Sequence, residues 1–215
     1  MKDILAFSKN PKKITERNEW RNIYFLQFII LMILIGGIAN IFPFIITKIF
    51  GIYDEINNLT LAEKLIRGVL IAPIAEELIF RLILKENKKY YYISIAVATA
   101  YLIVAVILGH QISSILMGIV ITLESLIFII HYYKQTDVYS KDNYKYLYWG
   151  NILVFGLMHG NNFSFVSHWQ IFLIPLLTLP QIFLGWVLSY IRVKYGIRYS
   201  IGFHFLINLQ VLLIP

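Results

Sequence analysis

The chain has 215 residues, of which 59% are hydrophobic and 14% charged, and it contains no cysteine. A soluble domain carries roughly a quarter charged residues, so this composition excludes a water-soluble globule and indicates a membrane protein. Nineteen Lys and Arg against twelve Asp and Glu give a net charge of +7, and the lack of cysteine excludes disulfides, thiol nucleophiles and cysteine-ligated metals.

Seven stretches are expected to be membrane-spanning helices, because a span needs about 20 predominantly apolar residues. In chain order they are Ile23 to Ile46, Leu61 to Leu84, Tyr91 to Leu108, Ile112 to Tyr133, Tyr146 to His159, Ile171 to Ile191 and Ser200 to Ile214. Thr60 and Glu63 form a capping-box pattern at the second helix, and the sixth is expected to bend at Pro175 or Pro180. The predicted fold class is all-α, a polytopic membrane helix bundle in a single domain over residues 1–215.

Basic residues are distributed unevenly between the connections of these helices. Fifteen of the nineteen Lys and Arg lie in residues 1–22 and in the connections after the second, fourth and sixth helices. The intervening connections, 51–58, 109–111 and 160–170, contain none. Because Lys and Arg are retained on the cytoplasmic side, we expect a cytoplasmic N-terminus with 1–22 as a basic arm. The expected partners of the basic charge are membrane lipids, not nucleic acid.

The second helix carries three ionisable side chains at hydrocarbon depth, where each costs at least about 2.5 kcal/mol unless it is paired or faces a cavity. They belong to the stretch Pro73-Ile-Ala-Glu-Glu-Leu-Ile-Phe-Arg81. Glu77 and Arg81 are spaced for an ion pair on one helical face, whereas Glu76 points about 100° away. The trio is expected either to hold the bundle together or to form part of a site. Glu124, in the fourth helix, is expected to pack through a hydrogen bond or to join that site.

Two further helices each carry a histidine. The fifth ends in Phe155-Gly-Leu-Met-His159, and the seventh contains His204-Phe-Leu-Ile-Asn208. A single intramembrane histidine is as often a hydrogen-bonded packing residue as a functional one. Together with Glu76 they make one carboxylate, two imidazoles and one amide, a set more typical of a hydrolytic site than of helix packing.

The order Glu-Glu-x-x-x-Arg, Phe-x-x-x-His and His-x-x-x-Asn on separate apolar helices resembles the CPBP family of intramembrane proteases, also called the abortive-infection (Abi) or CAAX-protease family. The resemblance covers about Leu61 to Asn208, with motif helices near 61–84, 146–160 and 200–214. Leu82 stands where family members often have glycine, and the third and fourth helices look like an inserted hairpin. The resemblance implies a CAAX-like endopeptidase, a peptide hydrolase with bacterial relatives linked to bacteriocin processing and immunity.

The resemblance also implies catalytic roles. Glu76 would be the base that activates a water, with His159 as its partner, and His204 and Asn208 would donate to the carbonyl oxygen. This mechanism needs no cofactor. Zinc held by Glu76, His159 and His204 is the alternative, since two His and a Glu are acceptable ligands. The metal-free mechanism is favoured because Asn208 is a poor zinc ligand and a good donor.

Three supporting residues complete the predicted site. Glu77 and Arg81 would orient the second helix as an ion pair, and Phe155 would pack one turn from His159; Glu77 could instead share the water with Glu76. The predicted protein lies in the bacterial cytoplasmic membrane as a multi-pass protein and cleaves a peptide or a membrane-anchored protein. The alternatives are a non-catalytic membrane immunity or regulatory protein that acts by binding, and a proton-coupled transporter, which lacks visible inverted repeats.

Overall fold

The computed structural model describes residues 2–12, 29–30, 33, 37, 41–109 and 111–213. These residues fold almost entirely into helices, which confirms the all-α class. The long helices are α5 (Lys88–Ile107), α6 (Gln111–Tyr132), α7 (Lys141–Met158), α9 (Leu179–Lys194) and α10 (Ile197–Leu213). The shorter elements are α1 (Lys2–Lys9), a helix over Ile41–Phe50, β1 (Tyr53–Asp54), η1 (Glu55–Asn58), η5 (His159–Asn162), β2 (Phe163–Ser164), η6 (His168–Leu173) and α8 (Ile174–Leu177). The two short strands, β1 and β2, pair antiparallel.

A continuous helical segment over residues 61–84, called the motif helix below, carries the paired acids. Its successive parts are α3 (Leu61–Glu63), η2 (Lys64–Ile71), α4 (Ala72–Glu76), η3 (Glu77–Arg81) and η4 (Leu82–Leu84). It begins with the expected capping box, in which the Thr60 N–H donates to Glu63 Oε2 at 3.0 Å and the Glu63 N–H donates to Thr60 Oγ1 at 3.3 Å. The parts η2 and η3 are π-helical, a geometry that occurs frequently at functional sites.

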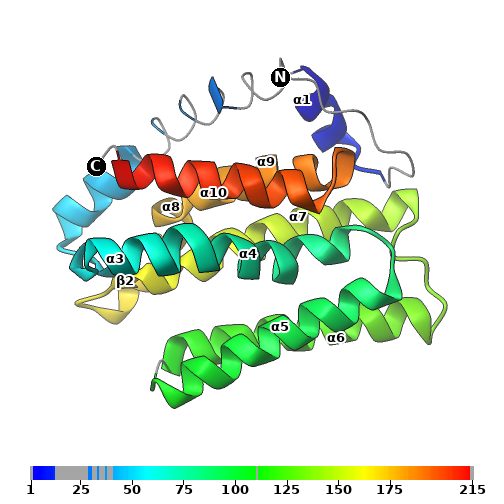
Figure 1. Cartoon of the computed structure of the whole chain (residues 1–215), viewed down its shortest axis with the longest axis horizontal. Coiled ribbons are helices and arrows are strands. Elements are labelled where there is room, and N and C mark those ends of the chain that lie inside the picture. The colour runs from blue at the N-terminus through cyan, green and yellow to red at the C-terminus, as the bar shows by residue number, and fades with distance from the viewer. Residues whose placement is uncertain are drawn as a thin grey trace.

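The motif helix, α7, α9 and α10 pack together as one bundle (Figure 1). Helix α7 packs against α9, α9 against α10, and α10 against η2 and α4. Helices α5 and α6 lie side by side as a hairpin at one edge of the molecule, where α5 contacts η3 and η4. The hairpin therefore supports the half of the motif helix that follows Glu76.

Two helices in the described part of the chain are long and apolar enough to cross a membrane alone, Lys88–Ile107 and Ile115–Tyr132. The helices His168–Leu177 and Leu179–Lys194 would form a third span if they are counted as one helix bent by 42°. The remaining expected spans that the structure describes are helical, but they are shorter or change helix type along their length. Seven spans with a cytoplasmic N-terminus therefore stay a prediction.

The sixth expected span is bent, as its prolines indicate. Pro175 lies in α8 and Pro180 in α9, and the two helices meet at Thr178 between them. The first expected span, Ile23 to Ile46, lies mostly outside the described residues, and its last part belongs to the helix Ile41–Phe50.

The start of the basic arm is a docked helix, α1, which charge alone does not predict. Its Ile4 is buried in an apolar cluster with residues of α9. The indole Nε1 of Trp186 donates to Ser8 Oγ at 2.5 Å, and Phe7 packs edge-on against Tyr148 of α7. One face of α1 is thus held against α7 and α9, and the rest of the arm from residue 13 lies outside the described residues.

Candidate active site

Two histidines from separate elements approach the carboxylate of Glu76. Glu76 ends α4, His159 is the first residue of η5, and His204 lies in α10. The Oε2 atom of Glu76 is 3.7 Å from Nε2 of His159 and 3.7 Å from Nε2 of His204. Within the described residues this buried oxygen has no hydrogen-bond partner, although 24% of the Glu76 side chain is exposed. Both imidazoles thus converge on one available carboxylate oxygen.

His159 is oriented by its own helix. Its Nδ1 is 2.9 Å from the carbonyl oxygen of Phe155. Because a carbonyl oxygen only accepts, Nδ1 carries the hydrogen, and Nε2 of the neutral tautomer would then present its lone pair to Glu76. The 3.7 Å separation is too long for a direct hydrogen bond, but it suits a water bound by both Glu76 and His159.

Glu77, the next residue, is fully buried and its oxygens are occupied. Its Oε1 lies 3.6 Å from Arg81 Nε and 3.2 Å from His204 Nδ1. The hydroxyl of Ser200 donates to its Oε2. The contact with Arg81 is the ion pair that the four-residue spacing indicates. Both oxygens of Glu77 are thus engaged, whereas Oε2 of Glu76 has no hydrogen-bond partner among the described residues.

His204 connects the two acids. Its Nδ1 faces Glu77 and its Nε2 faces Glu76, and the side chain is 1% exposed. A carboxylate beside Nδ1 holds a hydrogen on that nitrogen. Donation from Nε2 as well therefore requires the ring with both nitrogens protonated. In that state Nε2–H is a charged hydrogen-bond donor on the Glu76 side.

Arg81 packs on the ring of Phe155, which lies one turn before His159. The guanidinium carbon of Arg81 is 4.2 Å from the centre of the Phe155 ring, a cation–π contact. Arg81 Nη1 donates to Asn151 Oδ1 at 2.7 Å, and the Phe155 ring centre is 4.9 Å from that of His159. A Cβ atom at Gly185 would lie 2.8 Å from Phe155. Glycine therefore permits the close approach of α9 that holds this pair.

Asn208 of α10 binds a backbone carbonyl of the motif helix. Its Nδ2 donates to the oxygen of Gly68 at 2.8 Å. The Ala72 N–H donates to the Arg67 oxygen, so the next bond in this π-helical register would run from residue 73 to Gly68. Residue 73 is Pro73, which has no N–H, and Asn208 supplies the missing donor. Because an amide nitrogen carries two hydrogens, one is left for a ligand.

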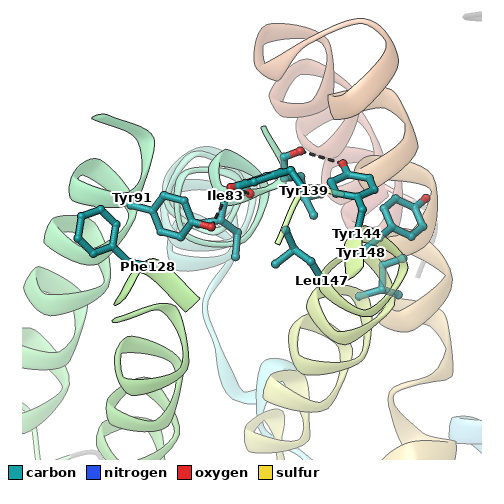
Figure 2. Close-up of a cluster of buried hydrophobic side chains, with 9 residues drawn as sticks. Ile83, Tyr91, Phe128, Tyr139, Tyr144, Leu147 and Tyr148 are labelled. Atoms are coloured by element: carbon teal, nitrogen blue, oxygen red, sulfur yellow. Dashed lines mark hydrogen bonds between the residues drawn. The ribbon is translucent and has the colours of Figure 1, made fainter. Parts of the chain in front are cut away.

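Side chains from neighbouring segments also bind the carbonyls at the end of the motif helix. The bonds are Ser94 Oγ to Ile79 O (2.6 Å), Asn151 Nδ2 to Phe80 O (2.6 Å), Arg192 Nε to Arg81 O (2.9 Å), Tyr139 Oη to Ile83 O (2.7 Å) and Tyr144 Oη to Leu84 O (2.8 Å). Figure 2 shows Tyr139 and Tyr144 gathered beside Ile83. The last carbonyls of a helix have no partner within it, and leaving them unpaired in apolar surroundings is costly. These donors therefore hold the helix that carries Glu76 in place.

The alternative zinc site would use the same three side chains as the metal-free reaction. Although both imidazole Nε2 atoms are close to Glu76 Oε2, residues 2–12, 29–30, 33, 37, 41–109 and 111–213 contain no group of three or more His, Asp or Glu side chains that could hold a metal ion. The Nδ1 atom of His204 is directed at Glu77, a contact that is also usual for a histidine that ligates zinc through its other nitrogen. The metal-free reaction and the zinc site therefore both stay predictions.

Several residues that hold the site were not predicted from the sequence. Ser200 lies four residues before His204, and Asn151 lies four residues before Phe155. This spacing places each pair on one helical face, so polar residues one turn from a motif residue were a usable signal. Ser94 had no such signal, because its partner is a carbonyl on a separate helix.

The fold and the site define a helical membrane protein in which an acid and two histidines meet between helices. The family model for type II CAAX prenyl endopeptidase Rce1-like proteins matches residues 58–210, more than two thirds of the chain. The chain therefore belongs to this family of membrane proteases. The matched range contains the whole motif helix, α7 and the residues from His204 to Asn208. Comparisons with curated proteins and with solved structures found no match.

Proposed function

We propose that the protein is an intramembrane endopeptidase that hydrolyses a peptide bond of a membrane-associated peptide or protein. The observation that carries this proposal is the buried Oε2 of Glu76 with the Nε2 atoms of His159 and His204 each 3.7 Å away. A carboxylate and a neutral imidazole at this spacing can bind and deprotonate a water. Membership of a CAAX endopeptidase family supports peptide hydrolysis as the reaction.

In the proposed reaction Glu76 and His159 hold the attacking water between them. Each offers an acceptor, so each takes one hydrogen bond from the water and leaves an oxygen lone pair directed at the substrate carbonyl. As the water oxygen bonds to the carbonyl carbon, one proton passes to Glu76. The carbon–nitrogen bond then breaks, and Glu76 gives this proton to the leaving amine. Glu76 returns to its carboxylate form without a covalent intermediate.

His204 and Asn208 are the proposed donors to the carbonyl oxygen, which becomes negatively charged in the tetrahedral intermediate. His204 donates from Nε2–H, and Asn208 donates the amide hydrogen that Gly68 does not use. Loss of one such donor lowers kcat by about 10²–10³-fold in other hydrolases. Glu77 and Arg81 act through His204, because Glu77 holds its Nδ1 and Arg81 holds Glu77. They are positioning residues.

The proposed location is the bacterial cytoplasmic membrane, with seven spans and a cytoplasmic N-terminus. The distribution of Lys and Arg supports this orientation. Large apolar side chains on α5 and α6 face outward, such as Ile107, which is 76% exposed, and membrane lipids are the partner such surfaces require. A precursor of a secreted peptide or a membrane-anchored protein is the proposed substrate, and processing of or immunity to a bacteriocin fits this chemistry.

The proposal is tested by neutralising the site in cells and measuring which membrane peptides accumulate by mass spectrometry. Glu76→Gln and His159→Asn should both cause the same peptides to accumulate. The matched control is His168→Asn, because His168 is an exposed histidine of η6 outside the site. Full cellular function and an unchanged set of peptides in both site variants would reject catalysis. That result would favour a non-catalytic immunity or regulatory protein that acts by binding.

Metal dependence is tested on purified protein with a synthetic copy of an accumulated peptide. We expect cleavage to persist after exhaustive chelation, with no stoichiometric zinc found by elemental analysis. Loss of cleavage on chelation, with recovery on adding zinc alone, would overturn the metal-free reaction.

A further inference from the structure

Glu124 is a buried carboxyl group that the proposed reaction does not use. It lies in the middle of α6 and is 3% exposed. Its Oε2 is 2.7 Å from Ser94 Oγ on α5, and the same hydroxyl is 2.6 Å from the carbonyl oxygen of Ile79 in η3. One serine thus connects the α5–α6 hairpin to the motif helix.

These two short contacts need two hydrogens, and a serine hydroxyl has one. The carbonyl of Ile79 only accepts, so Ser94 donates to it. The second contact is then a hydrogen bond only if Glu124 donates, which a carboxylic acid can do and a carboxylate cannot. Tyr139 provides a contrast. Its hydroxyl also donates to a carbonyl and lies 2.8 Å from the hydroxyl of Tyr91, but there Tyr91 brings a hydrogen of its own.

The surroundings also disfavour an ionised Glu124. Across the residues that the structure describes, none of the ion pairs includes Glu124, and its Oε1 is buried without a hydrogen-bond partner. On η3, against which α5 packs, Arg81 is already engaged by Glu77 and Asn151. A buried carboxylate without a counter-charge in apolar surroundings is so costly that it binds a proton instead.

We infer that Glu124 is a neutral carboxylic acid that donates to Ser94, and that Ser94 in turn donates to the Ile79 carbonyl, so that the hairpin holds η3 in place. Since η3 begins with Glu77 and ends with Arg81, its position sets that of the carboxylate that orients His204. Glu124 and Ser94 are therefore positioning residues. Their effect on cleavage rests on the proposed function, whereas the protonation of Glu124 does not.

Infrared difference spectroscopy of the purified protein in lipid at neutral pH tests the proton directly. The carbonyl stretch of a carboxylic acid is separate from the bands of a carboxylate. The spectrum of the wild type minus that of Glu124→Gln should contain the carboxylic acid band. If this difference spectrum contained carboxylate bands instead, the inference would be overturned. This measurement needs no proteolysis, so its outcome is independent of whether the proposed function holds.

Cleavage and thermal unfolding test the positioning role. Glu124→Gln keeps a donor in its amide group and should retain the cleavage rate within about twofold. Glu124→Leu keeps similar volume without a donor, and Ser94→Ala removes the donor to Ile79. Each should lower the rate about tenfold and lower the unfolding temperature, as expected for a lost buried hydrogen bond. Equal losses in the Gln and Leu variants, or no loss in the Leu variant, would overturn the proposal.

Discussion

Glu76 and Glu77 are adjacent in the chain but differ in their surroundings. Glu77 is 0% exposed, and its oxygens contact Arg81, His204 and Ser200. Glu76 is 24% exposed, and its Oε2 has no hydrogen-bond partner in the described stretches of the chain. Successive residues on a helix point about 100° apart, which turns one acid into the bundle and the other toward the two histidines. The same residue type thus serves structure at one position and the proposed chemistry at the next.

The largest expected effect is the loss of cleavage on substitution of Glu76 or His159. Glu76→Gln and His159→Asn should each lower kcat/KM by at least about 100-fold, because general acid–base groups contribute about 10²–10⁴-fold. If both hold one water, the double variant should be little worse than either single variant. The kinetics of folded, purified variants on one peptide measure this. Losses that multiply in the double variant would show that the two residues act separately.

Substitutions of Glu77 should change the free energy of unfolding. Glu77→Gln leaves the buried Arg81 without its counter-charge and should lower the free energy of unfolding by about 3–5 kcal/mol. The double variant Glu77→Leu with Arg81→Met should recover much of this loss, since it removes both buried charges. Unfolding in detergent or lipid is the measurement. An unchanged stability of Glu77→Gln together with abolished cleavage would reverse the roles of the two acids.

A smaller effect is expected where α10 meets the motif helix. Asn208→Ala leaves the Gly68 carbonyl without its donor and should cost about 1–3 kcal/mol of unfolding free energy. Adding Pro73→Ala supplies a backbone N–H and should restore stability in this background. Cleavage should stay low in the double variant, because the proposed oxyanion donor is still missing. Recovery of cleavage along with stability would show that Asn208 has only a structural role.

The smallest effect concerns Glu55, an exposed carboxylate in η1 that serves as a reference for Glu76 and Glu77. Hydrogen bonds from Ser164 and Asn58 hold the pKa of Glu55 below its usual range. Because this pKa is lower in the folded state, the contribution to stability is present above the usual glutamate pKa. It is lost as the pH falls through the lower folded value.

Hydrogen exchange of the amides in β1 and β2 should therefore accelerate as the pH falls below about 4, after correction for intrinsic exchange. In Ser164→Ala the exchange should already be faster at neutral pH and should change less on acidification. An identical pH response in the wild type and in Ser164→Ala would show that this hydrogen bond does not hold the two strands together.

The sequence predicted those features that depend on local spacing. The motif helix runs over residues 61–84 with the capping box of Thr60 and Glu63, because caps and apolar periodicity are properties of a short segment. The Glu77–Arg81 contact follows from a four-residue spacing on one helix. The sixth expected span bends at Thr178, between its two prolines, because a proline interrupts the hydrogen bonds of its own helix.

The features that the sequence did not predict depend on packing between distant segments. Tyr139 donates to the carbonyl of Ile83, which lies 56 residues away in the chain, and no local pattern links the two. The π-helical segments η2 and η3 likewise receive hydrogen bonds from other helices. Asn208 of α10 donates to Gly68 in η2, and Ser94 of α5 donates to Ile79 in η3. Asn208 combines a feature that local spacing predicts with one that depends on packing. Its spacing from His204 marked it as a site residue, but its bond to Gly68 required the structure.

The most direct test of the account compares cleavage by Glu76→Gln and by Glu77→Gln, each normalised to its folded fraction. We expect Glu76→Gln to be fully folded and to cleave at least about 100-fold more slowly than the wild type. The folded fraction of Glu77→Gln should be reduced, and its residual cleavage per folded molecule should exceed that of Glu76→Gln. Wild-type cleavage by Glu76→Gln, with none by folded Glu77→Gln, would contradict the assignment of Glu76 as the base.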